Sequence, residues 1–171
     1  MKSLFNLFIN ICLLRAKPQD VPASTALMLL TLFAVIATGV PGTIGLTGGL
    51  VSALLIGLLD VALTLILLQL FLAMMGLSSR LIQSATALFG TGVVINLLSL
   101  PVLWFMDVST GHSVNQSLGG LLYVALLVWS LVIMGHILRH SFKLHLGSGI
   151  LIAIGYFFLV NTLAQMFLPA A

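Results

Sequence analysis

The chain carries very little charge. Only three of its 171 residues are acidic and six are Lys or Arg, so charged residues make up 5% of the sequence. Soluble domains carry about 25% charged residues, and this composition therefore excludes a domain that folds in water. Hydrophobic residues make up 61% of the chain, and the mean hydropathy is +1.29. The sequence predicts an integral membrane protein.

Reactive side chains are also scarce. Cys12 is the single cysteine, which excludes an intramolecular disulfide and a cysteine-rich metal site. The sequence contains no recognisable nucleophile–base pair, paired carboxylates or metal triad, so we expect no enzyme activity and no cofactor. The net charge of +3 is small. We interpret it as a sign of membrane topology and expect no nucleic-acid partner.

A histidine cluster is the one candidate for metal binding. His136 and His140 are four residues apart, a spacing that can place two ligands on one helix face, and His145 could be a third ligand. Arg139 and Lys143 lie among them and would repel a divalent cation. We therefore favour histidines at the membrane interface and predict no metal.

Long apolar runs fill most of the chain. One crossing of a bilayer needs about 20 apolar residues, and the sequence predicts five spans at about 23–40, 48–76, 80–106, 118–138 and 146–168. The first is expected to end at Pro41. The predicted fold is all-α: a five-span transmembrane domain over residues 21–171, with the second and third spans long enough to tilt.

Residues 1–20 form a separate N-terminal segment. A narrow polar stripe and a wide apolar flank predict a short amphipathic helix lying in the membrane interface, followed by a linker with Pro18 and Pro22. The alternatives are disorder or membership of a longer first span.

The basic residues fix the expected orientation. If the N-terminus is cytoplasmic, five spans place every Lys and Arg on the cytoplasmic side, as the positive-inside rule requires. We therefore expect the C-terminus outside. We also expect these basic residues to bind anionic lipid headgroups. The predicted headgroup residues are Arg15, Lys17, Arg80, Arg139 and Lys143.

Asp60 is the one acidic residue inside a predicted span. It adjoins a row of small residues at four-residue intervals, and Gly92 belongs to a matching stripe on the third span. Small residues let helices approach closely in lipid, so Asp60 is expected to face a packed helix. The small residues of the predicted row are Gly45, Gly49, Ala53 and Gly57.

An antiparallel hairpin of the second and third spans would place Asp60 and Asn96 at similar depth. We therefore predict that these two side chains meet inside the bundle, with Asn161 as a further member of the polar network. Two interpretations remain open. Asp60 either holds helices together or serves as a proton or cation site in a transporter. The sequence favours the first, because only one carboxylate and no internal repeat are visible.

The last three spans carry a family resemblance. The segments "SATALFGTGVVINLLSLPVLWF", "LLVWSLVIMGHILRHSF" and "GILIAIGYFFLV" resemble the Yip1 family of five-span membrane proteins, especially its compact bacterial members. The resemblance implies a non-enzymatic scaffold in the bacterial inner membrane that acts on a protein partner or as a homo-oligomer. Eukaryotic members bind Rab GTPases through a long cytosolic region. Only about 20 residues precede the first span here, so a Rab partner is not expected.

Overall fold

The computed structural model describes the backbone of residues 2–108 and 113–167, and the side chains of 4–44, 47–106 and 117–166. In these residues the chain is helical and no strand occurs. The α-helices are α1 (Lys2–Cys12), α2 (Thr25–Thr47), α3 (Leu50–Met74), α4 (Leu81–Val108), α5 (Ser113–Phe142) and α6 (Leu146–Phe167). Two short 3₁₀ turns, Pro18–Asp20 and Ser78–Arg80, precede α2 and α4.

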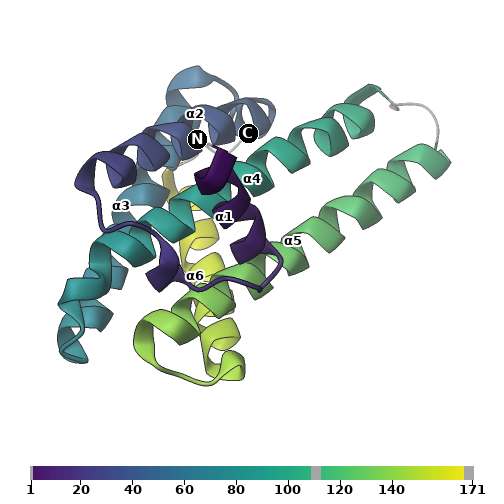
Figure 1. Cartoon of the computed structure of the whole chain (residues 1–171). Helices are drawn as coiled ribbons and strands as arrows, with labels where there is room; N and C mark the ends of the chain where they lie inside the picture. Colours follow the sequence, from purple (N-terminus) through teal and green to yellow (C-terminus); the bar gives the residue numbers. More distant parts are fainter. Residues whose placement is uncertain (1, 109–112, 168–171) are drawn as a thin grey trace.

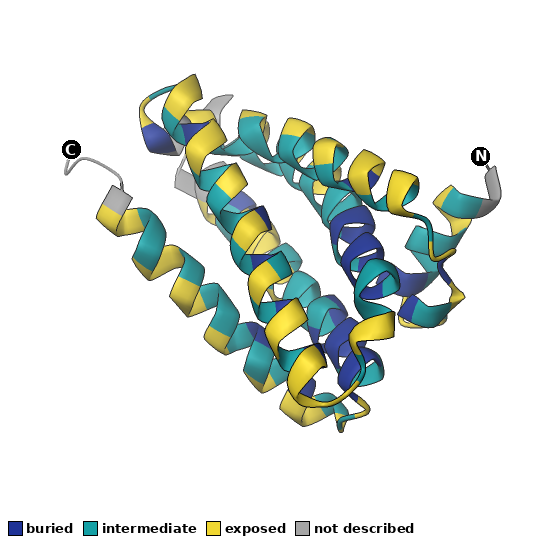
Figure 2. Ribbon diagram, turned by 90° about the vertical axis from the view of Figure 1, so that its left-hand side faces the viewer, coloured by how far each residue is buried: buried dark blue, intermediate teal, exposed yellow. Residues whose placement is uncertain are grey.

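The prediction of an all-helical bundle with five membrane-length helices is confirmed (Figure 1). Five helices of the described chain are long and apolar enough to cross a membrane, over Thr25–Ile44, Leu50–Met74, Ser78–Met106, Ser117–Phe142 and Leu146–Met166. Exposed residues run along the outer faces of the long helices (Figure 2). This pattern suits a protein surrounded by lipid, because apolar side chains that face lipid carry no free-energy penalty.

The expected end of the first span at Pro41 is wrong. The α2 helix continues through Pro41 and ends at Thr47, where Gly48 adopts a left-handed conformation with φ of 72°. A proline inside a helix removes one backbone hydrogen bond, and transmembrane helices tolerate this because nearby groups compensate. Glycine populates positive φ without steric cost, and so Gly48 stops the helix.

The five long helices form a ring. α4 packs extensively against α2 and α5, α3 packs against α2, and α6 packs against α5. The ring closes where α3 meets α6, and this junction is the least extensive of the five. α3 and α4 are consecutive in the chain, yet they touch much less than α2 and α4 do. The arrangement leaves space between α3 and α4 in the middle of the bundle.

Glycines set the two closest helix–helix seams. At the α5–α6 seam, a Cβ atom at Gly149 would lie 2.4 Å from the Gly135 carbonyl oxygen, and one at Gly135 would lie 2.6 Å from Ile150. At the α2–α4 seam, a Cβ atom at Gly92 would lie 2.9 Å from Val35. No side chain larger than hydrogen fits at these positions without a shift, so glycine allows the backbones to approach closely.

The predicted row of small residues on α3 is present only in part. Ala53 is buried. A Cβ atom added at Gly57 would lie 3.8 Å from the Ile36 side chain of α2. Gly49 is instead the residue at which α3 begins, and an added Cβ there would meet no neighbour within 4 Å. The surroundings of Gly45 lie outside the described residues. The row faces α2, because α2 rather than α4 is the main neighbour of α3.

The α1 helix is docked against the bundle. Ile11 and Cys12 are fully or almost fully buried, and Phe8 packs on Gly90 of α4. The indole nitrogen of Trp129, on α5, donates a hydrogen bond of 3.1 Å to the Cys12 carbonyl. Figure 1 shows α1 crossing α4 and α5. Part of the apolar surface of this segment is therefore covered by protein, while Phe5, Leu13 and Leu14 stay exposed. Its predicted placement in the membrane interface is not confirmed.

We predict that Gly149→Ala destabilises the protein by about 1–3 kcal/mol, because the new methyl group must displace the Gly135 backbone. Gly147→Ala is the matched control on the same helix, since a Cβ there meets nothing within 4 Å. The free energy of unfolding is measured by SDS titration in mixed micelles, followed by tryptophan fluorescence. Equal changes in the free energy of unfolding for the two substitutions would contradict the close packing of α5 on α6 at Gly149.

Burial raises the pKa of the Cys12 thiol to about 11, so we predict slow maleimide labelling at pH 7.5 in the folded protein. Gly90→Leu should displace Phe8, release α1 and speed labelling at least about tenfold, because exposure restores the thiolate. The rate is measured by mass spectrometry, and Gly120→Leu is the control because a Cβ there meets no neighbour. Fast labelling of the unaltered protein would contradict the docking of α1.

Candidate functional site

A cavity of about 460 Å³ lies within the ring, and all five long helices contribute to its wall. Most of the wall is apolar. The residues with polar side chains are Thr43, Asp60, Thr64, Thr91, Asn96, Ser99, Tyr123, Ser130, Tyr156 and Asn161. We call this space the Asp60 cavity. An apolar pocket with a few converging polar groups is the usual form of a small-molecule site.

Tyr156 is the hydrogen-bond partner of Asp60. The Tyr156 hydroxyl, on α6, donates to Asp60 Oδ1 at 2.6 Å and also lies 3.0 Å from the Asp60 carbonyl oxygen. The same hydroxyl lies 2.6 Å from Thr64 Oγ1, one turn further along α3. Thr64 can donate this bond, because the hydroxyl proton of Tyr156 is already engaged. These three side chains form the polar contact between α3 and α6.

The second carboxyl oxygen of Asp60 accepts no hydrogen bond from the part of the chain that the structure describes. Among the residues that the structure describes, no group donates a hydrogen bond to Oδ2, and this atom is not among the fully enclosed ones. No Lys, Arg or His occurs among the described residues of the cavity wall, and no ion pair involves Asp60 there. The carboxyl group therefore presents one oxygen to the cavity without a compensating positive charge.

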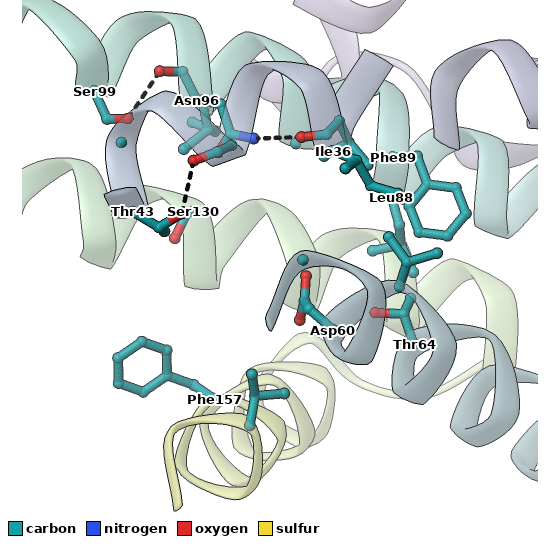
Figure 3. Close-up of a pocket in the computed structure, with 18 of the residues that line it drawn as sticks. Ile36, Thr43, Asp60, Thr64, Leu88, Phe89, Asn96, Ser99, Ser130 and Phe157 are labelled. Atoms are coloured by element: carbon teal, nitrogen blue, oxygen red, sulfur yellow. Dashed lines mark hydrogen bonds between the residues drawn. The ribbon is translucent and has the colours of Figure 1, made fainter. Parts of the chain in front are cut away.

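The predicted contact between Asp60 and Asn96 is not formed. The two residues lie on different walls of the same cavity (Figure 3). The Asn96 amide instead donates to the Val35 carbonyl oxygen at 3.2 Å and to Thr38 Oγ1 at 3.4 Å, both on α2. The hairpin argument matched the depths of the two residues, but it assumed that α4 faces α3 at this depth, where α4 in fact faces α2.

Asn161 lines the cavity but does not join the polar contact. Its amide donates to the Phe157 carbonyl oxygen at 2.8 Å within its own helix, and the residue is exposed. The predicted network of Asp60, Asn96 and Asn161 is thus three separate groups around one space. Tyr156 takes the place that sequence reasoning gave to Asn96.

The predicted headgroup residues gather at one end of the bundle, which we call the basic end. Gln19 Nε2 donates to the His140 carbonyl oxygen at 2.7 Å and Arg80 Nη1 donates to the same oxygen at 3.0 Å, which joins two connecting segments to the end of α5. These bonds satisfy a carbonyl of the last turn of α5. Arg80 and Arg139 are half-buried, whereas Arg15, Lys17 and Lys143 are exposed. The exposed three are the ones free to meet headgroups.

The two neighbouring histidines serve the docking of the N-terminal segment. His136 is buried, and its Nε2 lies 3.0 Å from the Ala16 carbonyl oxygen. His140 Nε2 lies 3.1 Å from Arg139 Nη2. Within the described residues, no group of three or more side chains is arranged to hold a metal ion. The geometry of this cluster is that of a structural contact.

Comparison with known proteins identifies no relative: no family model, curated protein or solved structure matches this chain. The resemblance to the Yip1 family therefore remains a prediction. The functional argument rests on the geometry of the Asp60 cavity.

We predict that a double-mutant cycle of Asp60→Leu and Tyr156→Phe shows a coupling of about 0.5–2 kcal/mol, as interhelical hydrogen bonds in lipid do, because leucine removes the acceptor of the Tyr156 hydroxyl. A cycle of Asp60→Leu and Asn96→Leu should be additive within about 0.5 kcal/mol, since the two side chains share no bond. Both are measured as free energies of unfolding in mixed micelles. Coupling in the second cycle alone would contradict the contact with Tyr156 and would support a contact between Asp60 and Asn96.

Proposed function

We propose that this protein binds a monovalent organic cation in the Asp60 cavity and carries it across the membrane in exchange for a proton. The observation that carries the proposal is the Asp60 carboxyl group, which lines the cavity with one oxygen that no described residue bonds and with no basic residue in the described wall. Ionisable residues at membrane depth commonly mark ion and proton pathways.

The electrostatics of the cavity allow only two states of Asp60. An ionised carboxylate without a positive partner is costly away from water. The group is therefore neutral with a proton or compensated by a bound cation. Binding of one cation then releases one proton from the same oxygen, and the charge of the site is unchanged. Because the proton and the cation cannot occupy the carboxyl group together, movement of one across the membrane is coupled to movement of the other in the opposite direction.

Aromatic side chains support a cation rather than an anion as ligand. Phe89, Tyr123, Tyr156 and Phe157 all line the Asp60 cavity. The negative face of an aromatic ring attracts a cation, and quaternary ammonium groups are recognised in this way. An anion would meet Asp60 without a described basic residue to balance it.

The remaining expectations accompany this proposal. We propose a bacterial inner membrane, a cytoplasmic basic end and binding of anionic lipids by Arg15, Lys17 and Lys143, which the exposure of these side chains supports. The scaffold role with a protein partner or homo-oligomer, expected from the family resemblance, stays the alternative prediction.

In proteoliposomes that enclose a pH-sensitive dye, we expect external tetramethylammonium to drive protons out through the unaltered protein. Asp60→Asn should abolish this flux, because an amide cannot exchange a proton for a cation. Asp20→Asn is the matched control, since Asp20 is exposed at the basic end and accepts a bond from the Lys17 backbone.

The fold of each variant is checked by tryptophan fluorescence before reconstitution. A flux that is unchanged in Asp60→Asn, or a flux that is absent from the unaltered protein, would overturn the proposed exchange and favour the scaffold role.

A further inference from the structure

A second cavity, of about 310 Å³, lies on the other side of the Tyr156–Thr64 contact. Residues of α3, α4, α5 and α6 form its wall, and the polar side chains among them are Thr64 and Tyr156. We call this space the apolar cavity. It extends toward the basic end, where Phe71, Leu138 and Phe142 line it.

The two cavities share part of their walls. Thr64, Leu88, Met134 and Tyr156 line both of them. The Tyr156 hydroxyl, which holds Asp60 and Thr64, lies at the boundary. A molecule whose polar group reaches Asp60 would therefore have an apolar space directly beside it.

The chemistry of the apolar cavity selects hydrocarbon. The hydroxyl groups of Thr64 and Tyr156 already bond to each other, so a polar ligand group would lose its hydrogen bonds to water and find little in return. A hydrocarbon chain loses nothing on leaving water, and each buried methylene favours binding. The wall contains leucine, isoleucine, methionine and phenylalanine side chains, which suit such a chain.

We propose that the apolar cavity holds the hydrocarbon tail of the cation whose charged head binds Asp60, so that the ligands of this protein are amphiphilic cations. This inference rests on the proposed function. The charged head of the ligand binds in the Asp60 cavity and its tail binds in the apolar cavity, with Tyr156 between the two.

The test is a series of alkyltrimethylammonium ions, beginning with tetramethylammonium and lengthening one chain. Dissociation constants are measured on the whole protein in lipid nanodiscs, from the protons released into a dilute buffer. We expect affinity to rise about fourfold per added methylene until the apolar cavity is filled. Nanodiscs with Asp60→Asn protein correct for partition of the probes into lipid.

Gly155→Leu is the variant that separates the two cavities. Gly155 is an exposed residue that lines only the apolar cavity, and a Cβ there would meet no atom within 4 Å, so a leucine fits at this position of the wall without moving neighbours. We expect it to weaken binding of the octyl member at least tenfold and to leave tetramethylammonium unchanged. Leu159→Phe, in the same wall, is a second filling variant.

Gly147→Leu is the matched control, because Gly147 lies on the same helix, lines neither cavity and has the same open surroundings. Tetramethylammonium binding that depends on Asp60, together with chain-length dependence that both filling variants leave intact, would overturn the inference and spare the proposed function. If the unaltered protein does not bind tetramethylammonium at all, the proposed function itself is overturned.

Discussion

The junction between α3 and α6 is the contact on which the rest of the structure depends. Four seams of the ring are held by extensive packing, and at two of them glycine lets helices approach closely. The fifth relies on the hydroxyl of Tyr156, which contacts Asp60 and Thr64. Water would compete for such a bond, but the lipid around a membrane bundle offers no competitor. One tyrosine thereby joins α3 to α6 and lies between a partly open cavity with a carboxyl group and a partly open cavity of hydrocarbon character.

The chemistry of the Asp60 cavity follows from what surrounds the Asp60 carboxyl group. Had a basic residue shared the cavity wall, Asp60 would form a buried ion pair and its role would be structural. The described wall contains hydroxyl groups, amides and aromatic rings instead. A carboxyl group in these surroundings responds to whichever positive species arrives, a proton or a larger cation. The same residue contacts α6 through Oδ1, and in the proposed function it meets the ligand through Oδ2.

The sequence was sufficient to predict the five spans, because a long apolar run has few alternatives to a membrane helix. Asp60 and Asn96, which the sequence paired, line one cavity but do not contact each other. The sequence could not predict Tyr156 as the partner, because spacing along a helix fixes a face but not which helix covers it. The same holds for α1. An apolar helix face can pack on lipid or on protein, and the sequence alone did not show that Gly90 and Trp129 contact this segment. A tyrosine hydroxyl within an otherwise apolar span was the available signal.

The docking of α1 has a consequence for biosynthesis. The chain emerges in order, so α1 is made before Gly90 and Trp129, the residues that cover it in the finished protein. At 5–20 residues per second, roughly ten seconds separate the two events. During that time its apolar flank must rest on a temporary surface, such as the translocon or the leaflet beneath it. Mature burial of Cys12 thus reports the final stage of assembly, and a nascent chain stalled within α5 would still expose that thiol.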